Sequence, residues 1–333
     1  MITADDLVSL PYTQDLTQAG VAYAARSLPY TYDRMGGSPF DRLRRIAAGV
    51  AVELAFRRYL TGEGVPFDIL GATPFSAPDR YDLALGGRRC DVKSYLIFKK
   101  SRIRPLRRDP ARLLEAPALV PSDQAADSHL AYEDLYIFAF VYALVTRTSA
   151  DLSRALAAGQ PHALVAPLPA AWSRPGEWSS LGALALKCDT SRPQGLTLGG
   201  QTAQREYQTE TIMLQPGRRT RAGTDYYSLA CLHAADLPDG PVGIHSPRLG
   251  ETHVVQPDKW GNIWIYGLEV VLAGYLTRGE FRRRARRVPP GTAVLQYPRT
   301  RVENMAVPLS DLRPITDLVA RAKSWADRLG RKI

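Results

Sequence analysis

Apolar positions along the chain follow helical spacing in three stretches. Residues 15–27 carry small apolar side chains at intervals of three or four, which predicts a short helix. Residues 41–64 keep this spacing over a longer stretch and stop at glycines, so they predict a second helix. Residues 310–330 show the same periodicity and predict an amphipathic helix near the end of the chain.

Other stretches have the apolar pattern of strands. Short runs at 65–70, 81–85 and 88–98 predict three strands, and the last two are joined by Gly86-Gly87, a connection suited to a type I′ or II′ hairpin. The unbroken apolar run 134–145 predicts a buried central strand. We therefore expect a helix, a three-stranded meander and a further strand.

Changes in composition and periodicity divide the chain into three predicted parts. Residues 149–262 are rich in Pro, Gly, Thr and Gln without strong periodicity, which favours a β-rich insertion. A regular pattern resumes at 263, with a helix-like basic segment at 277–288 and a strand-like run at 292–297. The predicted parts are an N-terminal helical extension (1–36), a core (37–148 and 263–333) and an insertion (149–262), which is a candidate recognition element.

Composition narrows the class of protein. Forty-three Lys and Arg against 33 Asp and Glu give a formal charge of +10, which favours polyanionic partners. The three cysteines are widely spaced without CxxC, so a disulfide framework and a zinc knuckle are not expected. No window approaches the roughly 18 to 20 apolar residues of a membrane span, and the first residues are acidic, unlike a signal peptide. We expect a soluble cytoplasmic protein with no membrane partner.

The stretch RYDLALGGRRCDVKSYL (80–96) carries the candidate chemistry. Asp91 and Lys93 lie two residues apart on a predicted strand, so their side chains point to the same face. Pairing outward from the glycine turn sets Asp82 opposite Asp91, and two like charges so placed repel unless a cation lies between them. None of the five histidines shows HxH or HExxH spacing, so carboxylates must hold any metal ion. Mg²⁺ prefers such oxygen ligands.

These residues resemble the PD-(D/E)xK nuclease superfamily. In that resemblance Glu53 matches the helical Glu, Asp82 the first acid, and Asp91 with Lys93 the (D/E)xK element. Asp79, in Pro78-Asp79, also matches the first acid and stays an alternative to Asp82. The resemblance covers residues 41–145 and implies an α/β fold with a restriction-endonuclease-like core: a helix, a three-stranded meander, a further strand and flanking helices.

The function implied by this resemblance is endonucleolytic hydrolysis of DNA with Mg²⁺, or Mn²⁺, as cofactor. Glu53, Asp82 and Asp91 would be metal ligands, and Lys93 would assist the attacking water. Double-stranded DNA is the expected partner, with a homodimer or partner defence proteins as further expectations, and restriction or phage defence as the expected role. The alternatives are a non-catalytic nucleic-acid-binding or assembly subunit that keeps the fold, and an RNA-directed nuclease.

Two basic clusters and the tryptophans complete the candidate surfaces. A cluster in a predicted loop directly after the 88–98 strand is expected near the metal, with candidate phosphate contacts at Lys99, Lys100, Arg102, Arg104, Arg107 and Arg108. A second cluster lies on the predicted 277–288 helix, with candidate contacts at Arg282, Arg283 and Arg286. The alternative for both is a solvated surface. Trp172, Trp178, Trp260 and Trp264 are candidates for stacking on extruded bases, with packing in the core as the alternative.

Overall fold

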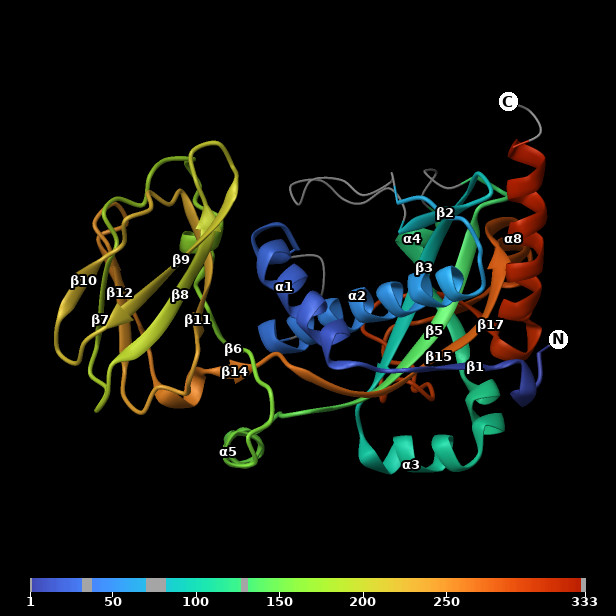
Figure 1. Cartoon of the computed structure of the whole chain (residues 1–333), viewed down its shortest axis with the longest axis horizontal. Helices are drawn as coiled ribbons and strands as arrows, with labels where there is room; N and C mark the ends of the chain where they lie inside the picture. The colour runs from blue at the N-terminus through green and yellow to red at the C-terminus, as the bar shows by residue number, and fades with distance from the viewer. Residues whose placement is uncertain (1, 32–37, 70–81, 127–130, 331–333) are drawn as a thin grey trace. The chain divides into compact units, whose positions relative to one another are not determined.

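The chain forms two compact units in the computed structural model, which describes residues 2–31, 38–69, 82–126 and 131–330 (Figure 1). Unit 1 comprises Met1–Gly20, Ala48–Leu144 and Ile265–Ile333, and unit 2 comprises Val21–Ala47 and Val145–Trp264. The second stretch of unit 2 contains the whole of residues 149–262. No helix in the described ranges is long and apolar enough to cross a membrane.

The first two predicted helices are present and pass from one unit into the other. Helix α1 (Gln14–Thr31) and helix α2 (Pro39–Gly62) each contain a unit boundary. Helix α1 is longer than its periodic stretch, whereas α2 has the predicted length but begins and ends two residues earlier. In α2, Pro39 stands at the first helical position, where its missing N–H costs no hydrogen bond.

Unit 1 is built on a mixed sheet with strand order β1-β15-β5-β3-β2. The bounds are β1 (Val8–Pro11), β2 (Leu83–Leu85), β3 (Arg88–Ile97), β5 (Leu135–Val145) and β15 (Ile265–Thr277). Strand β2 is antiparallel to β3, and β3 is parallel to β5. The first nine residues of β5 are buried, which confirms the central strand predicted from its apolar run.

The predicted hairpin joins β2 to β3. Gly86 and Gly87 have φ of +52° and +79°, values that suit a type I′ turn, and Leu85 lies opposite Arg88 as the pairing predicted. A Cβ on Gly86 would lie 2.3 Å from Cβ of Trp325 in helix α8 (Ile315–Gly330). Glycine is therefore required both by the turn and by the close packing of α8 on it.

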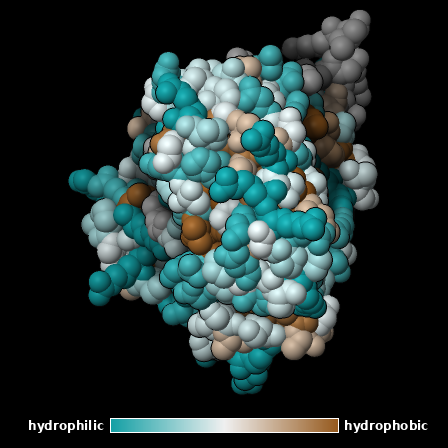
Figure 2. All heavy atoms as spheres, turned by 90° about the vertical axis from the view of Figure 1, so that its left-hand side faces the viewer, coloured by the Kyte–Doolittle hydropathy of each residue, from teal (hydrophilic) through white to brown (hydrophobic). Residues whose placement is uncertain are grey.

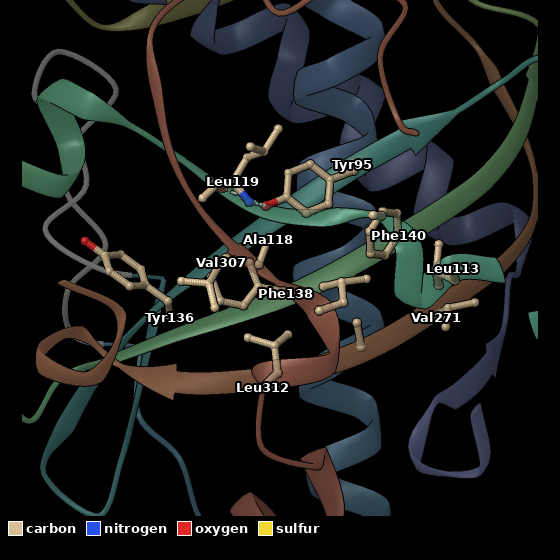
Figure 3. Close-up of a cluster of buried hydrophobic side chains, with 14 of the residues drawn as sticks. Tyr95, Leu113, Ala118, Leu119, Tyr136, Phe138, Phe140, Val271, Val307 and Leu312 are labelled. Atoms are coloured by element: carbon tan, nitrogen blue, oxygen red, sulfur yellow. Dashed lines mark hydrogen bonds between the residues drawn. The ribbon is translucent and has the colours of Figure 1, made fainter. Parts of the chain in front are cut away.

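The two faces of this sheet are covered differently. On one face, a smaller sheet of order β16-β17-β4 shares an apolar core with β3 and β5. In this core Tyr95 Oη donates a hydrogen bond to the Leu119 carbonyl and accepts one from the Leu119 N–H, each at 2.6 Å (Figure 3). On the other face, α2 packs with Gly49 against Ser94 of β3. The other elements of unit 1 are α3 (Lys100–Arg108), β4 (Pro117–Pro121), α4 (Ser122–Ala126), α7 (Arg278–Arg284), β16 (Arg286–Val288) and β17 (Asn304–Pro308).

Unit 2 is a β-sandwich of two antiparallel sheets with orders β10-β7-β12-β13 and β14-β6-β11-β8-β9, whose inner faces share one apolar core. Its elements are α5 (Ser149–Ala157), β6 (Leu164–Pro167), α6 (Ala170–Ser173), β7 (Ala185–Cys188), β8 (Gln194–Gln201), β9 (Tyr207–Leu214), β10 (Arg219–Arg221), β11 (Ser228–Ala234), β12 (Val242–Ser246), β13 (Glu251–Val255) and β14 (Gly261–Asn262). The face seen in Figure 2 is mostly hydrophilic, with apolar residues in small separate spots. Residues 149–262 are thus β-rich, as predicted.

Several expected elements differ from the structure. Residues 99–112 were expected as a loop, but Ile103 and Leu106 are buried and dock this segment as helix α3. Residues 292–297 were expected as a strand, but Val294 and Tyr297 exchange backbone hydrogen bonds and close a turn. In the described part of 65–70, only Asp68 forms a bridge, to Ala84. Strand β1, which pairs with β15, was not predicted.

Candidate active site at the β2–β3 hairpin

Asp91 and Lys93 form an ion pair on the face of β3 that carries the apolar core. The distance from Lys93 Nζ to Asp91 Oδ2 is 2.6 Å, and the two side chains are 14% and 24% exposed. Their partners on β5, in parallel register, are Tyr136 and Phe138. Strand alternation therefore places both charges on one face, as predicted, although the neighbouring strand is apolar at these positions.

Two other side chains surround the lysine. Nζ of Lys93 lies 2.7 Å from Oε1 of Gln124, which is carried by α4. It also lies 5.9 Å from the ring centroid of Tyr136. Burial, together with a smaller effect of the nearby Asp91 charge, raises the pKa of Tyr136 to about 12. The ammonium is thus held between a carboxylate, an amide oxygen and a neutral aromatic ring.

Asp82 lies in a bend directly before β2, at the edge of the sheet. The predicted register holds as far as Leu83 opposite Cys90. Beyond it, Oδ2 of Asp82 accepts a hydrogen bond of 2.6 Å from the Val92 N–H. That nitrogen is bonded to the carbonyl carbon of Asp91, so the two aspartates are close neighbours. The amide donor stabilises one carboxylate charge beside the other.

Glu53 approaches the hairpin from the α2 side. It lies one helical turn after Gly49, which packs on Ser94, and one turn before Arg57, whose Nη2 donates to the Asp82 carbonyl at 2.9 Å. Arg57 is also 3.7 Å from Oε2 of Glu53. Ser94 points to the face of β3 opposite to Asp91 and Lys93. The four predicted residues therefore meet at one hairpin but do not share one face.

The donor atoms at the hairpin suit a hard cation. Mg²⁺ is commonly held by one or two carboxylates, with waters and substrate phosphates completing its shell. Asp82 and Asp91 fit such a site by their chemistry. A larger ligand set is not assembled: the described residues contain no group of three or more His, Cys, Asp or Glu that could hold a metal ion. Asp79, the alternative ligand, lies outside the described residues.

Helix α7 brings arginines to the same face as Asp91 and Lys93. Its Phe281 packs on Tyr136 and Phe138, with ring centroids 5.2 and 5.9 Å apart. These are the β5 residues in register with the ion pair. Arg282 and Arg283 follow Phe281 on α7, whereas Arg286 lies on β16, because the helix expected over 277–288 ends at Arg284. All three arginines are exposed. This basic cluster therefore lies beside the candidate site.

The other basic cluster lies at the far end of β3, contrary to expectation. The strand continues for six residues from Asp91 to Ile97 before α3 begins, a distance of about 20 Å at the usual strand rise. Arg102 donates to the Leu295 carbonyl, and Arg107 lies 3.5 Å from Glu269. The remaining candidates of this cluster are exposed: Lys99, Lys100, Arg104 and Arg108. Proximity in sequence did not bring the cluster to the candidate metal ligands, because a long strand intervenes.

Sequence reasoning missed three residues at the site. Arg57 follows Glu53 by four positions on a predicted helix, and that spacing is a usable signal for an ion pair. Gln124 and Tyr136 had no such signal, because only the parallel pairing of β3 with β5 and the position of α4 bring them to Lys93.

The tryptophans separate into two groups. Trp172, Trp260 and Trp264 are buried, which agrees with the core alternative and excludes stacking on a bound base. Trp178 is only partly buried.

Comparisons of the chain with models of protein families, with curated proteins and with solved structures found no match.

Proposed function

We propose that this chain is a divalent-metal-dependent phosphodiesterase with a restriction-endonuclease-like core, acting on DNA. The observation that carries the proposal is the Lys93–Asp91 pair at 2.6 Å with the Asp82 carboxylate on the adjacent Val92 amide. The order α2, β2–β3 hairpin and β5 parallel to β3 supports the core assignment. A role in restriction or phage defence would follow from cleavage of foreign DNA.

Each residue has a distinct task in this proposal. A Mg²⁺ or Mn²⁺ ion held by Asp82 and Asp91 would neutralise phosphate charge and make bound water more acidic. Lys93 supplies a fixed positive charge, which stabilises the additional negative charge of a phosphate under attack. Gln124 holds the ammonium at the Asp91 carboxylate. Arg57 fixes the Asp82 backbone, and Glu53 orients Arg57.

The exposed arginines of α7 and β16 supply the contacts to the nucleic-acid backbone. Arg282 and Arg283 lie on α7, whose Phe281 packs on the β5 residues in register with the ion pair, and Arg286 follows on β16. All three are exposed, so they can meet phosphates on either side of the cleaved bond. Such contacts bind any sequence and weaken with salt. The +10 formal charge of the chain favours the same partner.

The decisive experiment measures cleavage of supercoiled plasmid DNA and of a labelled RNA in Mg²⁺ or Mn²⁺. We expect DNA cleavage by the wild type and a loss of at least about 100-fold in Lys93→Met and Asp91→Asn. Lys187 and Asp189 provide a matched control, because they form another Lys–Asp pair two residues apart, at 2.9 Å, on unit 2. Lys187→Met and Asp189→Asn should cleave like the wild type.

Three outcomes would count against the proposal. A wild-type protein that leaves both nucleic acids intact in both metals would refute catalysis. Variants at Lys93 and Asp91 that cleave normally would refute the site. Cleavage of RNA alone would reassign the substrate.

A non-catalytic nucleic-acid-binding role is the second candidate. It is favoured by the lack of any larger metal-ligand group among the described residues. In that case the wild type would bind DNA without cleaving it, and Lys93→Met and Asp91→Asn would bind with unchanged affinity.

A further inference from the structure

Unit 2 presents an aromatic and cationic surface cluster of Trp178, Tyr227 and Arg205, called here the Trp178 cluster. The Trp178 and Tyr227 ring centroids lie 5.6 Å apart with an interplanar angle of 41°. The guanidinium carbon of Arg205 lies 4.2 Å from the indole centroid of Trp178. Both rings are partly exposed and Arg205 is exposed. The cluster therefore offers solvent two aromatic rings and one cation at a single position.

Arg205 occupies a backbone conformation that disfavours its residue type. It lies in the turn between β8 and β9 with φ of +62°, and it is the single non-glycine residue with positive φ among the described residues. Glycine adopts this conformation without the steric cost that any L side chain incurs. The turn would thus be more stable locally with glycine. A side chain kept at such a position points to a role beyond folding.

Hydrogen bonds hold Trp178 and the turn that carries Arg205 in place. Nε1 of Trp178 donates to the Ala203 carbonyl at 3.1 Å, so the indole is anchored to the turn that carries Arg205. Gln201 donates to the Arg205 carbonyl at 3.3 Å and accepts a 2.9 Å bond from Ser228. Gln201 and Ser228 are buried. The surface is therefore fixed before any ligand arrives, which lowers the entropic cost of binding.

The chemistry of the cluster matches a nucleobase with its phosphate. Aromatic rings and guanidinium planes stack on the face of any base, and stacking is worth about 1–3 kcal/mol per base. The N–H groups of an arginine also pair with phosphate oxygens. A base within a duplex has both faces covered by its neighbours, so only an unpaired or extruded base can stack here.

We propose that the Trp178 cluster is a binding site for an unpaired nucleobase. The base stacks on the exposed aromatic and guanidinium surface, and Arg205 contacts the adjoining phosphate. This function is separate from phosphodiester cleavage. It requires no metal ion and involves none of the residues of the β2–β3 hairpin.

The test measures binding of a single-stranded 12-nucleotide DNA in EDTA by fluorescence anisotropy. EDTA removes metal-dependent cleavage, so the result does not depend on whether the chain is a nuclease. We expect Trp178→Ala and Arg205→Gly each to weaken binding about tenfold, and Trp178→Phe to keep most of the affinity, since a phenyl ring still stacks. A fully paired duplex should compete poorly for the site.

Two controls separate binding from folding and charge. Arg205→Gly relieves the positive φ, so its thermal midpoint should equal or exceed that of the wild type, and weaker binding could not then be attributed to unfolding. Arg218→Gly removes an exposed arginine from the same unit and should change affinity less than twofold.

The proposal is overturned if the wild type does not bind the oligonucleotide. It is equally overturned if Arg205→Gly and Trp178→Ala bind as tightly as the wild type, or if Arg218→Gly weakens binding as much as Arg205→Gly. The last result would indicate general attraction of charge, without a stacking site.

Discussion

Helices α3 and α7 are both rich in arginine, yet they occupy different positions in unit 1. Helix α7 packs on β5 through Phe281, next to the Lys93–Asp91 pair. Helix α3 follows the carboxyl end of β3, about 20 Å along the strand from Asp91. The arginines of α3 and α7 could therefore contact different parts of a bound nucleic acid.

The two helices are also attached in different ways. Ile103 and Leu106 anchor α3 in the apolar core. Helix α7 combines buried Phe281 with a polar anchor, in which Glu280 accepts from Thr277 and pairs with Arg313. An arginine-rich helix thus takes its position from its few buried residues, and its exposed charges follow.

The largest effect should come from the apolar anchor of α3. Leu106→Ala leaves a cavity in the core and should lower the free energy of unfolding by about 2–5 kcal/mol. Urea denaturation followed by circular dichroism would measure it. Leu268→Ala, at an exposed leucine, is the matched control and should change stability by less than about 0.5 kcal/mol. Equal effects would contradict the assignment of α3 to the core.

The polar anchor of α7 should give a smaller, pH-dependent effect. Burial raises the pKa of Glu280, but hydrogen bonds from Arg313 and Thr277 and the charge of Arg313 lower it by more, so it lies below its usual value. A lowered folded-state pKa means that the carboxylate stabilises the fold above about pH 4.3, its value in the unfolded chain, and that this contribution is lost as pH falls further.

Glu280→Gln should therefore cost about 1–2 kcal/mol at pH 7 and flatten the loss of stability between pH 5 and pH 3. Unfolding curves across this range would test it. Glu177→Gln, at an exposed ion pair with Arg248, is the control and should leave the pH profile unchanged. A steep profile retained in Glu280→Gln would show that other carboxylates govern acid unfolding.

DNA binding should distinguish the exposed charges of the two helices. The double variant Arg282→Gln with Arg283→Gln removes two of the proposed phosphate contacts of α7. It should weaken duplex binding about tenfold and reduce the slope of log K against log salt by about 2. Anisotropy measured over a salt series, without divalent metal, provides both values. Unchanged affinity would show that DNA does not contact α7.

The smallest effect is expected from the matched charges of α3. Arg104→Gln with Arg108→Gln removes the same formal charge from exposed positions at the far end of β3. We expect less than a twofold change in affinity in the same assay. A loss of affinity equal to that of the α7 variant would show that both helices contact DNA, and would indicate a duplex that follows the whole length of β3.

Much of the site's local geometry could be predicted from sequence. The glycine pair set the hairpin register, and strand alternation placed Asp91 with Lys93. The helix carrying Glu53 and the buried strand β5 were also predicted, because local periodicity reflects which face of an element is buried. The turn at 292–297 was missed because its apolar residues pack on the core without strand pairing.

Only the tertiary structure decided what surrounds these residues. Gln124 and Tyr136 reach Lys93, and α7 packs on Tyr136 and Phe138, through the parallel pairing of β3 with β5 and the packing of distant segments. The Asp82 carboxylate turned to the Val92 amide at the sheet edge, where a free N–H needs an acceptor. Sequence alone determined the local elements and the residues with candidate chemistry, because hydrophobic periodicity and turn preferences act over a few residues. Which of them meet depended on contacts between residues far apart in the chain, and no local pattern records those contacts.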